Sequence, residues 1–263
     1  MAVSAIFYAI EFNNYLAGKS YDAVIIRADR YELLMISAVC AYRGIPIVHQ
    51  EGGADSGVKV IDTKVRDAIS QLADIHLVTD EQAEKRLIFL GASPKTVFNV
   101  GSFDVSYAKS INPKRMIKED YILCLFHSIP GEDEKAFYKT IKEFEPQYKI
   151  IGIKSNSDYK ESISTEEYSP EDFISLLYYA KCVLGNSSCI CKETSILGTP
   201  SVLVGGRQGN RITGRNVLKV PFDEYEIKRA VEYQLAHKRY ELDMIYYQPD
   251  MEIKTCEILK KMI

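Results

Sequence analysis

The chain has 263 residues, of which 46% are hydrophobic and 26% are charged. This length and balance are typical of one large α/β domain or two smaller ones, and they exclude a disordered chain or a fibrous repeat. The 33 basic residues are offset by 36 acidic ones, so the net charge of −3 disfavours nucleic acid and anionic membranes as partners. No apolar run approaches the roughly 20 residues of a membrane span, and no signal peptide is recognisable. We therefore expect a cytoplasmic location.

Short apolar runs alternate with amphipathic stretches, which predicts parallel strands joined by helices and hence an α/β fold. The chain opens on a helical stretch, and strands are predicted at residues 22–26, 45–48, 75–78, 97–100, 121–126, 149–153, 182–184 and 201–204. Capping residues mark three helix starts: Thr79 with Gln82, Ser169 with Pro170, and Asp223 with Glu226. From about Tyr240 onward the composition predicts one or two terminal helices.

The polar, proline-bearing stretch at residues 110–115 is the most linker-like part of the chain. It predicts a first Rossmann-like domain at residues 1–112 and a second at residues 113–240. The terminal segment at residues 241–263 is expected to return to the first domain.

Six cysteines mostly interrupt apolar runs, as reduced and buried thiols do: Cys40, Cys124, Cys182, Cys189, Cys191 and Cys256. We interpret them as core residues. Cys189 and Cys191 form half of a possible metal site, but no second pair of ligands completes a tetrahedral set, so no metal is expected.

Two polar positions follow predicted strands in the second half of the chain. Residues 185–188, Gly-Asn-Ser-Ser, lie between a strand and a helical pattern that holds Glu193. A helix N-terminus there would offer free N–H groups and hydroxyls to a phosphate, although the same residues also serve as an ordinary helix cap. Glu193 is either a ribose ligand or a solvated helix residue. His127 ends the strand at 121–126, at the sheet edge where ligands bind.

A glycine-rich loop follows the strand at 201–204 and carries Arg207, Gln208 and Arg211. Guanidinium groups suit phosphate oxygens, and glycine allows close approach of the backbone. The alternative is a mobile surface loop, which the position at a strand's carboxyl end disfavours.

The first half of the chain places acidic residues beyond two strands. Asp29 follows the first strand, and His49 and Glu51 follow the second with the spacing of one strand face. Asp62 and Arg66 are four residues apart in a helical stretch, so they can pair on one face, although such pairs are usually surface decoration.

Six blocks in this order resemble the UDP-N-acetylglucosamine 2-epimerase family, most closely its hydrolysing, sialic-acid-pathway branch. They are residues 28–30 (Ala-Asp-Arg), residues 49–53 (His-Gln-Glu-Gly-Gly), Asp62 with Arg66, His127, residues 185–193 (Gly-Asn-Ser-Ser to Glu193), and residues 207–217 (Arg-Gln to Asn-Val). The similarity extends from about Asp22 to Val220. Each block alone is weak, whereas six in order at strand ends are specific.

The resemblance implies a glycosyltransferase-B-like fold, with two Rossmann-like domains facing a cleft and the first domain incomplete. It implies UDP-binding residues in the second domain: Asn186, Ser187, Ser188, Glu193, Arg207, Gln208 and Arg211. It implies that Asp29, Glu51, Asp62 and Arg66 surround the sugar and that His127 assists the departing diphosphate. Glu51 is the preferred base and Asp62 the second, and the sequence does not separate them. No cofactor is implied.

The family reaction removes the C2 proton as UDP leaves, and water converts the resulting 2-acetamidoglucal to N-acetylmannosamine.

Three residues and the start of the chain depart from the family pattern. Glycine is usual where this chain has Ala28, Ile190 and Asn210, and Ile190 is expected to narrow the phosphate approach. An upstream half-domain is also expected, so the chain is interpreted as N-terminally truncated.

Exposed sheet edges in such a chain predict a homo-oligomer or a second chain that supplies strands. The alternatives are a non-catalytic or split-subunit UDP-sugar-binding protein, an enzyme for a related UDP-acetamido sugar, and a glycosyltransferase of the same fold.

Overall fold

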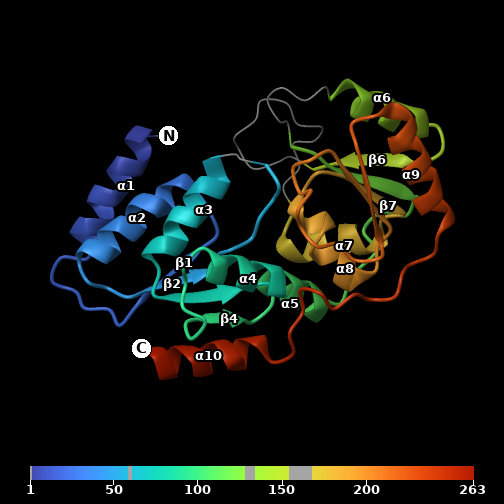
Figure 1. Ribbon diagram of the computed structural model, residues 1–263. Coiled ribbons are helices and arrows are strands. Elements are labelled where there is room, and N and C mark those ends of the chain that lie inside the picture. Colours follow the sequence, from blue (N-terminus) through green and yellow to red (C-terminus); the bar gives the residue numbers. More distant parts are fainter. Residues whose placement is uncertain (1, 59–60, 128–133, 154–167) are drawn as a thin grey trace. The chain divides into compact units, whose positions relative to one another are not determined.

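The computed structural model describes residues 2–58, 61–127, 134–153 and 168–263 (Figure 1). The chain forms two compact units: unit 1 comprises Met1–Phe103 and Gln248–Ile263, and unit 2 comprises Asp104–Tyr247. This division lies at the start of helix α5 (Phe103–Ser110), before the linker predicted at residues 110–115. The physical reason is that Val105 and Ala108 of α5, together with Tyr246, are buried in the core of unit 2.

Unit 1 contains a parallel four-stranded sheet in the order β1-β2-β3-β4. The strands are β1 (Val24–Arg27), β2 (Ile47–Gln50), β3 (Ile75–Val78) and β4 (Val97–Asn99). The helices that accompany them are α1 (Ala2–Tyr15), α2 (Tyr31–Tyr42), α3 (Ile61–Leu72), α4 (Glu81–Phe89) and α10 (Met251–Met262). Because all strands are parallel, their carboxyl ends lie along one edge of the sheet.

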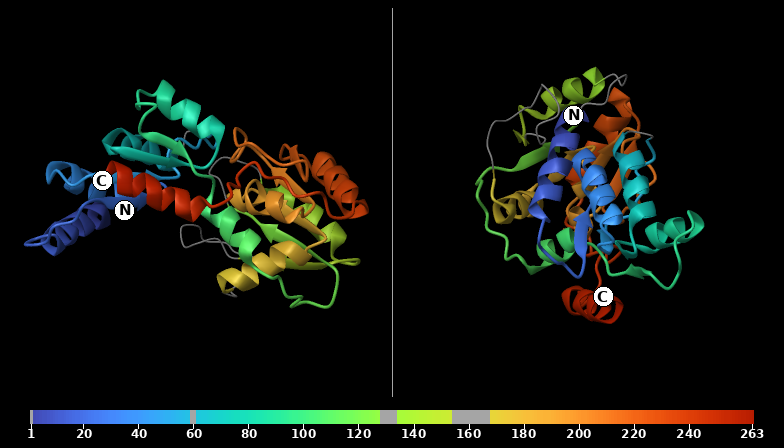
Figure 2. Two further views of the ribbon diagram at one scale, coloured as in Figure 1. Left: turned by 90° about the horizontal axis from the view of Figure 1, so that it is seen from below. Right: turned by 90° about the vertical axis from the view of Figure 1, so that its left-hand side faces the viewer.

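The sheet of unit 1 has an apolar core on each face. Ile26 and Ile47 pack with Val65 and Ile69 of α3. On the other face, Val48 and Leu77 pack with Met251 of α10, so the C-terminal helix belongs to unit 1 (Figures 1 and 2).

Unit 2 contains a parallel five-stranded sheet in the order β6-β5-β7-β8-β9. The strands are β5 (Tyr121–Leu125), β6 (Lys149–Gly152), β7 (Cys182–Gly185), β8 (Ser201–Val204) and β9 (Val217–Val220). Besides α5, the helices are α6 (Lys135–Phe144), α7 (Pro170–Tyr179), α8 (Glu193–Leu197) and α9 (Glu224–Ala236), and a 3-10 turn spans Ser188–Ile190. The central strands are buried on both faces, which explains their unbroken apolar sequences.

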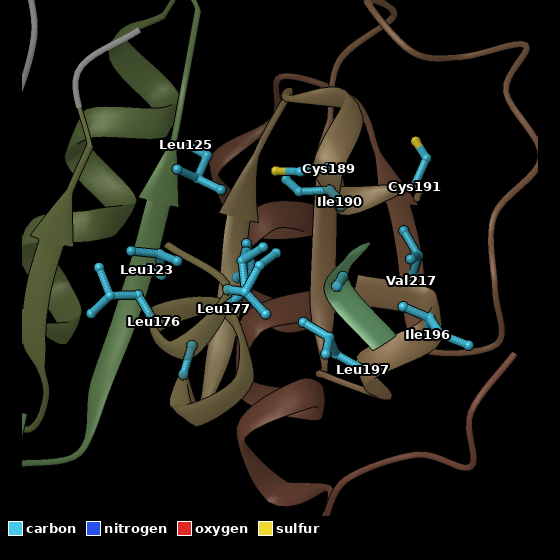
Figure 3. Close-up of a cluster of buried hydrophobic side chains, with 14 of the residues drawn as sticks. Leu123, Leu125, Leu176, Leu177, Cys189, Ile190, Cys191, Ile196, Leu197 and Val217 are labelled. Carbon is cyan, nitrogen blue, oxygen red and sulfur yellow. The ribbon is translucent and has the colours of Figure 1, made fainter. Parts of the chain in front are cut away.

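Ile190 lies in the larger core cluster of unit 2, with Cys189 and Leu177 among its members (Figure 3). Its side chain is fully buried. The prediction that Ile190 narrows the phosphate approach is therefore wrong, because the side chain fills the core. Five of the six cysteines are buried as predicted, whereas Cys256 on α10 is exposed.

All eight predicted strands are present, and each begins and ends within two residues of its predicted bounds. The predicted α/β class is confirmed. The short edge strand β9 was not predicted, because Lys219 interrupts its apolar pattern. The caps at Ser169 and Asp223 are confirmed by hydrogen bonds from Asp172 N and Glu226 N. The cap predicted at Thr79 is instead Asp80, which accepts from Ala83 N. One or two helices were predicted after about Tyr240, and the structure has one there, α10.

Among the described residues, no helix combines the length and apolarity that crossing a bilayer requires.

Gly53 lies in unit 1 where a side chain has no room. Its φ is +76°, and a Cβ atom would lie 2.5 Å from the carbonyl oxygen of Ala83. Gly44 has a similar φ of +66° but no atom within 4 Å of the same position. Gly44→Ala therefore isolates the backbone cost of about 1–2 kcal/mol, whereas Gly53→Ala adds overpacking and should cost about 3 kcal/mol. Urea denaturation followed by circular dichroism measures both, and equal losses would contradict the prediction.

Candidate functional site

The strand order of unit 2 reverses at β5, which pairs with β6 on one side and with β7 on the other. In open parallel sheets, ligands bind beyond the carboxyl ends of the strands at such a reversal. His127 follows β5 and Asn186 follows β7, so both residues lie at this point. The topology thus places the two predicted residues in one location.

Asn186 and His127 are joined by a pair of hydrogen bonds. The Asn186 side-chain oxygen accepts from the His127 main-chain N–H at 2.8 Å, and its amide nitrogen donates to the His127 carbonyl at 2.7 Å. Asn186 is completely buried. Arg207, from the loop after β8, donates to the Asn186 carbonyl at 3.2 Å. Residues that follow three neighbouring strands are therefore connected.

His127 is mostly buried, and burial lowers the pKa of its imidazole to about 4, with the nearby Arg207 guanidinium lowering it further in the same direction. The imidazole is therefore neutral at pH 7. A bound anion would favour its protonated form, because the negative charge opposes both causes.

Ser187 and Ser188 are half-buried and begin a 3-10 turn of three residues, Ser188–Ile190, followed by the five-residue helix α8. The predicted helix N-terminus is thus too short to carry a substantial macrodipole. What this segment offers is hydroxyl groups. Glu193 is the first residue of α8.

The glycine-rich loop is fastened by Lys219, whose ammonium donates to the carbonyls of Gly209 at 2.9 Å and Arg211 at 2.8 Å. Gln208 Oε1 and Arg211 Nε are buried and have no hydrogen-bond partner among the described residues. Buried polar atoms without partners are costly and uncommon in native proteins. Two of them in one loop indicate a place where a polar ligand can bind.

Two lysines in this region were missed by the sequence reasoning. Lys219 lies on the unpredicted strand β9, and Lys192 is buried directly before α8, where its ammonium pairs with Asp104 at 3.1 Å. Neither belongs to a motif, and their roles depend on which carbonyl or carboxylate the fold brings near. Asn210, one of the positions where the resemblance leads us to expect glycine, is exposed.

In unit 1, Asp29 and Arg66 form an ion pair. Arg66 is buried, and its other terminal nitrogen donates to the Ala54 carbonyl at 2.8 Å. The suggested Asp62–Arg66 pair is wrong, because Arg66 turns toward the carboxyl end of β1. Asp62 is exposed on the first turn of α3.

Glu51 follows β2, and its carboxylate pairs with Arg27 at 3.0 Å. Its side chain is only 12% exposed, whereas that of Arg27 is 46% exposed. Glu51 has a φ of +65° and Ala28 a φ of +66°, so the chain leaves both strands through left-handed residues. Glycine adopts this conformation at lower cost than alanine, which agrees with the expectation of glycine at position 28 from the resemblance.

His49 is fully buried next to these turns. Its Nε2 lies 3.0 Å from the Ala28 carbonyl and its Nδ1 lies 2.9 Å from the Ser70 hydroxyl. The carbonyl can only accept, so Nε2 carries a proton. Because burial lowers its pKa to about 4, the imidazole is neutral at pH 7. His49 thus anchors the turn before Asp29, and the structure does not present it to a ligand.

Among the described residues, no three histidine, cysteine or carboxylate side chains gather in a way that would hold a metal ion.

The two parallel α/β units, with the strand reversal in unit 2, have a glycosyltransferase-B-like fold. The sequence model of the family described as UDP-N-acetylglucosamine 2-epimerase matches residues 2–260. The chain therefore belongs to the UDP-N-acetylglucosamine 2-epimerase family.

Two relatives and one solved structure illustrate the similarity. The UDP-N-acetylglucosamine 2-epimerase of Neisseria meningitidis is 32% identical over 262 residues, covering 89% of this chain and 69% of the relative. The GDP/UDP-N,N'-diacetylbacillosamine 2-epimerase (hydrolyzing) of Campylobacter jejuni is 28% identical over 230 residues, covering 75% and 59%. The Methanocaldococcus jannaschii UDP-GlcNAc 2-epimerase, solved in complex with UDP-GlcNAc and UDP, superposes with a TM-score of 0.74 at 19% identity, covering 98% and 80%.

The chain spans between 59% and 69% of the length of four curated relatives that it matches.

The burial of neutral His49 predicts a loss of stability in acid. Its folded pKa of about 4 lies below the ordinary 6.5, so the unfolded chain binds the proton more readily. The stabilising effect is complete above pH 6.5 and is lost as the pH falls from 6.5 to 4, by roughly 3 kcal/mol in total. Urea denaturation at a series of pH values measures it.

The carboxylates also titrate in this range, so the comparison needs variants. His49→Gln should flatten the pH dependence of the free energy of unfolding, whereas His237→Gln, which changes an exposed histidine, should leave it as in the wild type. Identical pH profiles for His49→Gln and the wild type would contradict the prediction.

Proposed function

We propose that the protein is a hydrolysing UDP-N-acetylglucosamine 2-epimerase, which converts UDP-N-acetylglucosamine and water to N-acetylmannosamine and UDP. The observation that carries the proposal is the connection of His127, Asn186 and Arg207 at the strand reversal of unit 2. A cation, a half-buried imidazole and hydroxyls at that position match the charge of a departing diphosphate.

The proposed reaction has two steps. In the first, a carboxylate takes the C2 proton, the C1–O bond breaks, its electron pair leaves with UDP, and a C1–C2 double bond forms. In the second, water adds across the double bond of 2-acetamidoglucal, with hydroxyl at C1 and hydrogen at C2. The atoms balance without a redox partner or a cofactor.

In unit 2 we assign the diphosphate and nucleoside to the polar residues beyond β7 and β8. Arg207 and Arg211 would contact phosphate oxygens, because guanidinium groups form paired hydrogen bonds with them. Ser187 and Ser188 would add hydroxyl contacts. Gln208 Oε1 and Arg211 Nε would gain the partners that they lack within the described residues. Glu193 would bind the ribose.

His127 would assist the departure of UDP. A dianionic leaving group beside a neutral imidazole raises the proton affinity of that imidazole, so His127 can then donate a proton to the leaving oxygen.

In unit 1 we assign the sugar chemistry to Glu51 and to the Asp29–Arg66 pair. Glu51 is the proposed base, because its carboxylate is largely buried at the end of β2, whereas Asp62 is exposed. The pair between Asp29 and buried Arg66 fixes a second carboxylate beyond β1.

The names of the similar proteins support this proposal and one alternative. The Methanocaldococcus jannaschii structure contains UDP-GlcNAc and UDP, and the Campylobacter jejuni relative is described as a hydrolyzing epimerase of a diacetylbacillosamine nucleotide. A related UDP-acetamido sugar is therefore the nearest alternative substrate. A non-catalytic or split-subunit UDP-sugar-binding protein is the alternative in which UDP binds without turnover.

We also propose that the protein self-associates through α1. Four apolar residues on this helix are 52–82% exposed: Val3, Ile6, Phe7 and Ile10. Apolar groups in such number are expected to be covered by protein. Light scattering of the purified chain should give at least twice the monomer mass, and Ile6→Glu with Phe7→Glu should give a monomer. A monomeric wild type would point to a second chain as the partner.

The activity is tested by incubating the protein with UDP-N-acetylglucosamine in D2O. UDP should be released and the sugar product should carry deuterium at C2, because the proton lost in the first step is replaced from solvent. UDP binding by calorimetry without release would favour the non-catalytic alternative. Release only from a diacetylated UDP sugar would favour the related substrate.

Glu51→Gln and Asp62→Asn separate the two candidate bases. Glu51→Gln should lower UDP release by about 10²-fold or more, since a well-placed base contributes about 10²–10⁴-fold. Asp62→Asn should lower it by less than about threefold, because this carboxylate is exposed. The same assay measures both, and the opposite order of effects would assign the base to Asp62.

A further inference from the structure

Asn186 is engaged on every polar atom by other parts of unit 2. Its main-chain N–H donates to the Leu125 carbonyl at 3.0 Å, and its own carbonyl accepts from Arg207 at 3.2 Å. Its side chain takes both main-chain groups of His127, at 2.8 Å and 2.7 Å. The residue was expected to contact UDP, yet its side chain faces protein.

Holding both main-chain groups of one residue has a particular consequence. The N–H group of His127 reports the peptide plane before its Cα atom, and its carbonyl reports the plane after it. When one rigid amide binds both, the two backbone dihedrals of His127 are fixed together, and with them the direction of the Cα–Cβ bond. The start and direction of the His127 side chain are then fixed, although the residue lies beyond the end of strand β5.

The surroundings make this clamp rigid. Asn186 is completely buried, and Gly185 before it is paired with Leu125 in the β5–β7 ladder. A side chain at position 185 would collide with the Leu125 carbonyl oxygen, so the two strands approach more closely than other residues allow. The amide of Asn186 is therefore carried by the sheet and does not depend on loop packing.

We propose that Asn186 is a positioning residue: its side-chain amide fixes the main chain of His127 and so directs the imidazole at the leaving diphosphate. This inference rests on the proposed function of His127. It gives Asn186 no contact with the reacting atoms and assigns the binding of UDP to its neighbours Ser187, Ser188 and Arg207.

A merely structural role must be distinguished, because any buried asparagine needs hydrogen-bond partners. Asn216 provides the matched control. It is also buried in unit 2, and its amide donates to Thr194 Oγ1 at 3.0 Å and to the Thr199 carbonyl at 2.7 Å. Asn216→Ala removes a comparable set of hydrogen bonds that do not involve His127.

The first measurement is the kinetics of UDP release by the full chain. Asn186→Ala should lower kcat about 10- to 100-fold, the loss typical of a misplaced catalytic group, with the Kd of UDP changed less than threefold. Arg207 keeps its partner, because that partner is the main-chain carbonyl of residue 186. Asn186→Asp keeps an acceptor for the His127 N–H, so its kcat should fall less than that of Asn186→Ala. This second variant allows the test if the alanine variant does not fold. Asn216→Ala should keep kcat within threefold of the wild type.

The second measurement does not depend on turnover. In proteins labelled at histidine, NMR titration follows the imidazole of His127, assigned with His127→Gln. Asn186→Ala should raise its pKa from about 4 toward 6.5, because a released side chain gains access to water. Asn216→Ala should leave this pKa unchanged.

The two measurements separate the possible failures. If the wild type neither binds UDP nor releases it, the proposed function fails, and the titration alone decides whether the clamp exists. An unchanged titration of His127 in Asn186→Ala overturns the inference. So does a kcat within threefold of the wild type, or an equal loss of kcat in Asn216→Ala.

Discussion

The pairing of β5 with β7 is the constraint on which the chemistry of unit 2 depends. Leu125 lies opposite Gly185, and the absence of a side chain at position 185 allows the Leu125 carbonyl oxygen to approach. The residues that leave these strands, His127 and Asn186, are therefore brought together by the sheet itself. A polar group that directly follows paired strands is positioned by the many backbone hydrogen bonds of the sheet. Its position is therefore more precisely defined than that of a group on a loop.

Unit 1 uses a related device with different chemistry. Its chain leaves β1 and β2 through the left-handed residues Ala28 and Glu51, a conformation that costs about 1–2 kcal/mol for a residue other than glycine. The carbonyl of Ala28 is held by the neutral imidazole of His49, whose own position is set by Ser70. Strain of this kind persists where the surroundings determine it, and here it stands beside Asp29.

The sequence was sufficient for the fold of unit 2 because its central strands are buried on both faces and therefore appear as runs that are almost entirely apolar. It was also sufficient to place polar residues at strand ends, since parallel topology brings those ends to one edge. It did not predict which partner each side chain would choose. Arg66 is four residues from Asp62 but pairs with Asp29, which is 37 residues away in sequence. Spacing alone favours the local partner, and tertiary structure decides otherwise.

Ile190 illustrates the same limit. It lies between serines and a glutamate that sequence similarity associates with a ligand, yet its side chain is in the core. The 3-10 turn at Ser188–Ile190 rotates successive residues to different sides, so neighbours in sequence face opposite environments. Lys219 was overlooked because it lies on an edge strand and belongs to no motif. That it holds the glycine-rich loop is evident only from its hydrogen bonds to the Gly209 and Arg211 carbonyls.

The electrostatics of unit 2 couple the proposed acid to the proposed ligand. In the free protein, burial and the Arg207 guanidinium both hold the pKa of His127 low, at about 4, so the imidazole is neutral at pH 7. A diphosphate would neutralise the guanidinium and add its own attraction for a proton, and both changes favour the imidazolium. The residue would thus become an acid only when a leaving group is present to receive its proton. Such coupling requires that imidazole and guanidinium keep a fixed separation. Asn186 joins the two residues, because its side chain binds the main chain of His127 and its carbonyl accepts from the Arg207 guanidinium.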